Sequence, residues 1–106
     1  MSKERINQSK YAQLVGKLIN FAYAQGYELT IGDAWRPDRK GHVPDSYHYI
    51  RLAIDLNLFV NGNWIENYSP EWQILGDYWK SLDPECTWGG DFKKKKDYDH
   101  FSYGER

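Results

Sequence analysis

The chain of 106 residues contains a single cysteine, Cys86, and no long apolar run. One cysteine cannot form a disulfide within the chain, which is typical of a protein made in a reducing compartment. No segment approaches the roughly 20 consecutive apolar residues that span a bilayer. The N-terminus, MSKERINQSK, is too polar for a signal peptide. We therefore expect a protein that is made in the cytoplasm without a signal peptide and that does not insert into a membrane.

An excess of charge of one sign is also missing. Lys and Arg number 14 against 15 Asp and Glu, so the net charge of −1 does not indicate binding to nucleic acid. Repeats, low-complexity linkers and composition shifts are absent too, and the length is that of one domain, expected over residues 1–106 and as a monomer. Aromatic residues, in contrast, are abundant at 17% of the chain, enough to fill a small core and line a groove.

Apolar spacing predicts two helices. The first is expected over residues 9–25, with Ser9 as its N-cap and Gly26 as its C-terminal stop. The second begins at Ser69-Pro70-Glu71, where a capping residue precedes a proline in the first helical position, and it runs to Leu82. Its spacing predicts that three residues are buried: Trp72, Leu75 and Trp79.

Strands are predicted around residues 27–31, 51–58 and 100–103. In the second of these, leucines and an isoleucine alternate with polar residues, so Asp55 should face away from the core, into a cleft floored by the sheet. The sequence Asn61-Gly62-Asn63 signals a hairpin, and the chain after Pro84 is expected to be irregular. The order of elements predicts an α+β fold with a small antiparallel sheet and two main helices.

Three residues are candidate metal ligands: His48, Asp55 and His100. Two imidazoles and one carboxylate suit zinc, and three protein ligands leave a fourth position for water. The odd spacing of His48 and Asp55 puts them on opposite faces of one strand, so His48 must come from the incoming loop or from beyond a bulge. Two distant histidines are weak evidence, and all three residues could instead be ordinary structural residues. His42 is a reserve ligand.

Asp97, three residues before His100, is the candidate general acid and base. Asp99 competes for this role. On a continuous strand both acids would share one face and His100 would lie on the other, so only a turn before His100 would bring Asp97 to the metal.

Two basic segments have both a functional and a structural interpretation. Arg36, in Ala34-Trp35-Arg36-Pro37, could hold a substrate carboxylate or an oxyanion, or could simply stack on Trp35. The lysine run 93–96 could attract an anionic polymer to the site, or be a solvated loop.

Four motifs taken together resemble the LAS-type zinc peptidases, over about residues 30–103: Ser46-x-His48, Ala53-x-Asp55, Trp88-Gly89-Gly90-Asp91-Phe92 and Asp97-x-x-His100. That family includes D-alanyl-D-alanine carboxypeptidases and dipeptidases, and phage L-alanyl-D-glutamate endopeptidases. The resemblance implies a zinc ion as cofactor. It implies these site residues: His48, Asp55 and His100 as ligands, Asp97 as catalytic acid and base, Arg36 as contact to the carbonyl or oxyanion, and Ser46 as an orienting partner. Trp88, with Arg36, is expected to contact the substrate.

An aspartate before the final histidine is more similar to the phage-lysin branch. The resemblance therefore implies an endolysin-like enzyme that is released to the cell wall and cuts the L-alanyl-D-glutamate bond of the peptidoglycan stem peptide. One alternative is a D-alanyl-D-alanine carboxypeptidase or dipeptidase. Another is a non-catalytic zinc-containing domain that binds the wall. Arg51 stands where the family often has glycine. A glycine would allow positive φ or a close backbone approach, so the arginine is expected to change the path of the loop and the shape of one substrate pocket.

Overall fold

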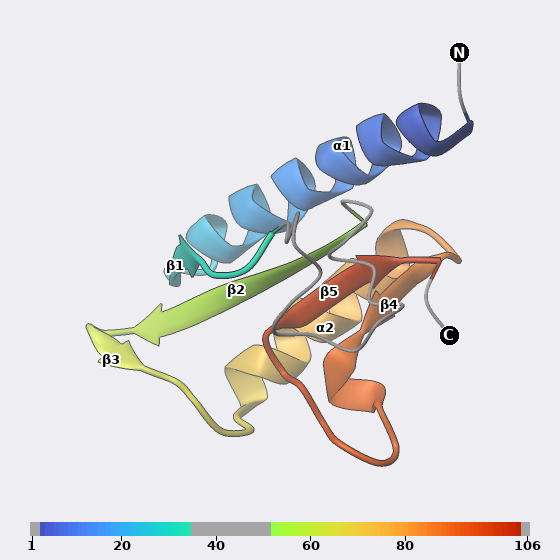
Figure 1. Cartoon of the computed structure of the whole chain (residues 1–106). Helices are drawn as coiled ribbons and strands as arrows, with labels where there is room; N and C mark the ends of the chain where they lie inside the picture. The colour runs from blue at the N-terminus through green and yellow to red at the C-terminus, as the bar shows by residue number, and fades with distance from the viewer. Residues whose placement is uncertain (1–2, 35–51, 105–106) are drawn as a thin grey trace.

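The computed structural model describes residues 3–34 and 52–104, and within them the chain forms two α-helices and five short strands (Figure 1). The helices are α1 (Lys3–Ala24) and α2 (Pro70–Leu82). The strands are β1 (Glu28–Ile31), β2 (Ala53–Val60), β3 (Asn63–Trp64), β4 (Cys86–Trp88) and β5 (His100–Tyr103), and a single 3-10 turn, η2 (Gly89–Asp91), follows β4. This is the α+β architecture predicted from the sequence.

The strands form one antiparallel sheet in the order β1-β2-β5-β4, with β3 paired to β2. Both helices pack on the same face of it. Trp79 of α2 contacts Tyr11 of α1 and Phe101 of β5, with ring centroids 5.8 and 6.0 Å apart, respectively. The Tyr11 hydroxyl also donates a hydrogen bond to the Phe101 carbonyl, at 2.8 Å. The helices therefore cover one face, and the other face of the sheet is left to carry polar side chains.

Strand β2 follows the alternation in its sequence. Ile54, Leu56 and Leu58 are buried against the helices, whereas Asp55 and Asn57 are only half-buried. The predicted hairpin follows, because Asn61 and Gly62 both have positive φ (52° and 79°) and β3 pairs back onto β2. Asp55 and Asn57 are two residues apart on one strand, so their side chains lie next to each other on the face of the sheet opposite the helices.

Helix α2 begins as predicted. Ser69 is its N-cap and accepts a hydrogen bond from the Trp72 amide at 3.2 Å, and Pro70 occupies the first helical position. Trp72, Leu75 and Trp79 are fully buried. Helix α1 differs from its prediction at the N-terminal end. It begins at Lys3 rather than after Ser9, because residues 3–8 contain no helix breaker. It ends at Ala24, just before Gly26, whose φ is +86°.

The expectation of an irregular chain after Pro84 is wrong for residues 86–88. These residues form β4, which pairs with β5. A strand of three residues is too short to show a periodic pattern, so its pairing partner is what makes it a strand. Cys86 lies in this strand and is buried, and burial raises the pKa of its thiol to about 12. The described helices include none that is both long and apolar enough to cross a bilayer.

Candidate metal centre

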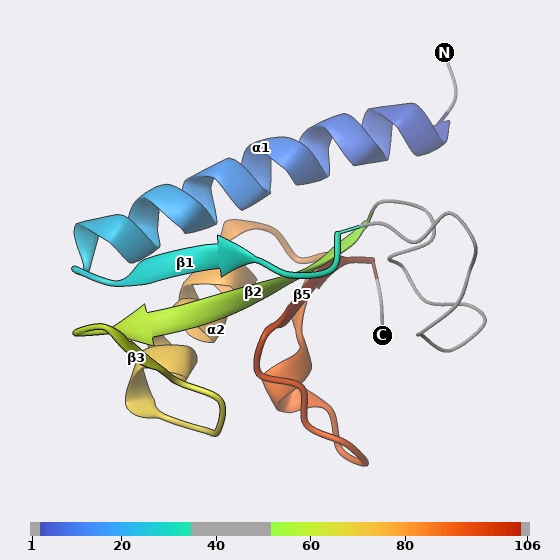
Figure 2. The ribbon, with the colours of Figure 1, turned by 60° about the vertical axis from the view of Figure 1, so that its left-hand side comes forward.

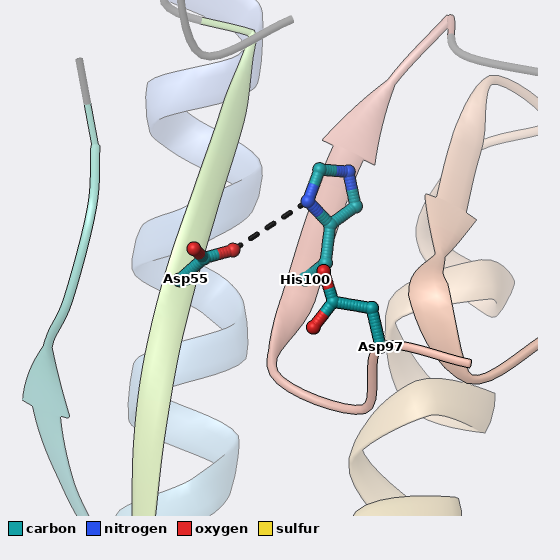
Figure 3. A group of neighbouring side chains, drawn as sticks. All are labelled: Asp55, Asp97 and His100. Carbon is teal, nitrogen blue, oxygen red and sulfur yellow. Dashed lines mark ion pairs between the residues drawn. The ribbon is translucent and has the colours of Figure 1, made fainter. Parts of the chain in front are cut away.

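Asp55 and His100 face each other across two neighbouring strands. They are register partners in the antiparallel pairing of β2 with β5, so their side chains project from the same face of the sheet. Asp55 Oδ1 lies 3.5 Å from His100 Nδ1 (Figure 3). The imidazole is buried and the carboxylate is 19% exposed. Figure 3 also shows both helices behind the sheet, with this pair in front of it.

A turn brings Asp97 to the same place. The His100 amide donates to the Asp97 carbonyl at 3.1 Å, which closes the turn immediately before β5. The Asp97 amide donates in turn to the Gly89 carbonyl, at 2.9 Å, so η2 fixes where the turn begins. On a continuous strand, Asp97 and His100 would lie on opposite faces. Because this turn comes between them, the Asp97 carboxyl group lies beside His100 (Figure 3).

The three side chains form a group that could hold a metal ion. One potential ligand atom from each of Asp55, Asp97 and His100 lies within 4.8 Å of the others. An imidazole nitrogen with carboxylate oxygens is a donor set that suits zinc. Carboxyl groups held this close together repel one another when both are ionised, and a cation between them removes that repulsion. By this test the residues present fit the metal that the sequence predicts.

Asp99 also lies close to the carboxyl groups of Asp97 and Asp55. Burial is the largest cause that raises the pKa of its carboxyl group, to about 8, and the neighbouring Asp97 and Asp55 raise it further. Asp99 is not a member of the three-residue group. Of the two acids that compete for the role of acid and base, Asp97 is therefore the one that the structure places with His100.

A protein-family profile described as D-alanyl-D-alanine carboxypeptidase matches residues 39–103, more than half of the chain. The chain belongs to this peptidase family. The match contains all three residues of the group and the segment in which His48 is predicted as a ligand. The resemblance to the LAS-type peptidases, drawn from four short motifs, is thus confirmed.

Among solved structures, the peptidase is similar to the L-Ala D-Glu endopeptidase ChiX of Serratia marcescens, with a TM-score of 0.64 and 20% sequence identity. The similarity covers 87% of this chain and 78% of the Serratia protein. At this identity it shows a shared fold. None of the curated protein sequences matches the chain.

Trp88 is a buried residue that holds the turn carrying Asp97 in this peptidase. Its indole nitrogen donates to the Tyr98 carbonyl at 2.7 Å, inside the turn that carries Asp97. The ring is only 1% exposed, so the prediction that Trp88 contacts the substrate is wrong. Gly76 and Gly90 lie against the ring, since a Cβ on either would come within 2.3 Å of its atoms. The Trp-Gly-Gly motif thus packs the core beneath the site.

Gly89 is a residue that the sequence reasoning noted in a motif but gave no role. A Cβ at this position would lie 2.2 Å from the Asp97 carbonyl oxygen and 2.9 Å from the His100 Cβ. Only glycine lets η2 approach the turn this closely. The signal in the sequence was the paired glycine itself, eight residues before Asp97.

The remaining predicted site residues lie outside the described part of the chain. These are Arg36, Ser46 and His48, together with the reserve ligand His42 and the departure from the family pattern at Arg51. Their assignments stay predictions.

Proposed function

We propose that this peptidase is a zinc-dependent peptidoglycan hydrolase that cuts the L-alanyl-D-glutamate bond of the stem peptide. The observation that carries the proposal is the cross-strand pair of Asp55 and His100 with Asp97 held beside it, all within 4.8 Å. The family to which the chain belongs supports the peptidase chemistry.

Burial divides the three residues between two roles. Asp55 and His100 are largely enclosed, as ligands are, and with the predicted His48 they would hold the zinc ion. Zinc, when bound, supplies a Lewis acid that polarises the peptide carbonyl and makes water more acidic. Asp97 is exposed, as a residue that exchanges protons must be. Its carboxylate accepts a proton from the attacking water and passes it to the leaving amine. Arg36 is predicted to bind the carbonyl or oxyanion.

Two bonds of the stem peptide are candidates. The Serratia protein of similar fold is an L-Ala D-Glu endopeptidase, which favours the bond proposed here. The description of the family favours the alternative, removal of a terminal D-alanine. A third possibility, a zinc-containing domain that binds the wall without cutting it, does not explain why Asp97 is held in the group by its own turn.

Digestion of purified peptidoglycan by the zinc-loaded protein tests the proposal. Mass spectrometry of the products should find new amino termini on D-glutamate, and these should be absent after chelation. Release of free D-alanine instead would establish the carboxypeptidase alternative. Binding of zinc and of peptidoglycan without any new terminus would favour the non-catalytic domain.

A further inference from the structure

A pocket of about 320 Å³ opens directly beside the metal centre. Asn57 of β2 lines it, next to Asp55 on the face of the sheet opposite the helices. One wall comes from Trp64 of β3 and from the segment between β3 and α2, including Glu66. The other wall comes from the turn before β5, including Asp97 and Asp99. Figure 2 shows these two segments descending from the sheet at the same side of the molecule. Because Asp97 belongs to both the pocket lining and the group of Asp55, Asp97 and His100, the pocket is within reach of a substrate held at that group.

The charge of the described lining is mainly negative. Glu66 and Asp97 contribute two carboxylates, whereas Lys96 contributes the one ammonium group of the described lining. That ammonium is directed to backbone: Lys96 Nζ donates to the Gly90 carbonyl at 3.2 Å and to the Phe92 carbonyl at 3.5 Å. The pocket is therefore built to accept hydrogen-bond donors and positive charge rather than a carboxylate.

Trp64 adds an aromatic surface to this lining. Three of the four tryptophans in the described residues are at most 1% exposed, whereas Trp64 is 55% exposed. An exposed indole and a carboxylate in the same lining are the two groups that recognise an ammonium group, by cation–π attraction and by a charge-assisted hydrogen bond.

We propose that this pocket binds the ammonium-bearing side chain of the diamino acid in the stem peptide, with Trp64 and Glu66 as the residues that determine this preference. The inference rests on the proposed function. Within the polymer, the alanine and the glutamate at the proposed scissile bond carry no positive charge. The diamino acid that follows the glutamate is the first residue that does, and it lies one residue from the bond, within reach of a pocket that begins at Asp97.

Two synthetic peptides test the proposal: N-acetyl-L-alanyl-γ-D-glutamyl-L-lysyl-D-alanine and the same peptide with norleucine in place of lysine. The zinc-loaded protein should cut the lysine peptide with a kcat/KM about tenfold higher, the size expected for one partly desolvated ammonium–aromatic contact. Glu66→Gln and Trp64→Leu should each remove most of this preference, mainly through KM. Glu28→Gln, which changes an exposed glutamate of β1 outside the pocket, should retain it.

Equal kcat/KM for the two peptides in the unaltered protein would overturn the inference, as would an equal loss on both peptides in Glu66→Gln. Calorimetric binding of the two peptides to zinc-loaded Asp97→Asn separates this inference from the proposed bond. A preference for the lysine peptide that Glu66→Gln abolishes supports the pocket assignment even if another bond is cut. No preference in binding refutes it even if the proposed bond is the one cut.

Discussion

At the scale of single residues, the roles of the three clustered side chains separate by exposure. Asp97 is exposed, and Asp97→Asn keeps its shape while removing its ability to accept a proton. We expect hydrolysis to fall by about 100- to 10,000-fold while the zinc content is unchanged. Rate assays paired with metal analysis on the same sample check this, and Asp77→Asn on α2, another exposed aspartate, is the matched control. Loss of zinc from Asp97→Asn would make Asp97 a ligand and contradict its assignment.

The turn that carries Asp97 can pack against Gly89 because this residue has no side chain. Gly89→Ala would put a Cβ 2.2 Å from the Asp97 carbonyl oxygen, so the turn must shift or the protein must strain. We expect a loss of about 1–3 kcal/mol in the free energy of unfolding, together with loss of hydrolysis. Gly16→Ala is the control, because it lies on the exposed side of α1 with nothing within 4 Å. It should stabilise the protein by roughly 0.5–1 kcal/mol. Urea denaturation measures the free energy of unfolding of both variants. An unchanged value in Gly89→Ala would show that Gly89 does not approach the Asp97 carbonyl this closely.

At the scale of elements, the N-terminus of α2 depends on one side chain. Ser69→Ala removes the oxygen that accepts the Trp72 amide hydrogen bond, and should cost about 1 kcal/mol of unfolding free energy. Ser81→Ala near the other end of the same helix should change it by less than about 0.5 kcal/mol, because Ser81 is exposed and its hydroxyl bonds only the Tyr78 carbonyl. Thermal unfolding of both variants checks the difference. Equal effects would mean that the Ser69 side chain does not stabilise the N-terminus of α2.

Elements with a strong local pattern could be predicted, and elements made by pairing could not. The alternation in β2 and the cap and spacing of α2 lie in the sequence itself, so both were located correctly. β4 was missed because its three residues are a strand only through β5. The site divides in the same way. Asp55 and His100 were predicted from the sequence as zinc ligands, and the structure places them side by side. The choice between Asp97 and Asp99 needed a turn fixed by the Gly89 carbonyl, a contact between segments.

At the scale of the whole molecule, the candidate metal centre of Asp55, Asp97 and His100 joins parts of the chain that are distant in sequence. Asp55 lies on the central strand and His100 on the last, and the helices that cover the other face contact both strands through the core. Bound zinc would therefore stabilise the sheet as a unit, since the unfolded chain does not hold these ligands together.

Removing zinc should lower the melting temperature of the whole protein in one cooperative transition. At free zinc a hundredfold above its Kd, binding adds about 2.7 kcal/mol. For a domain of this size that corresponds to roughly 10 °C. Calorimetric scans before and after chelation, with metal analysis of each sample, measure the shift, and re-addition of zinc should restore it. In Asp55→Asn, which keeps the shape of the side chain but weakens a ligand, the shift should shrink. A set of ligands that joins β2 to β5 should not lose its zinc ion without weakening the pairing of these strands. An unchanged melting temperature after verified removal of zinc would therefore show that zinc binding does not stabilise the fold.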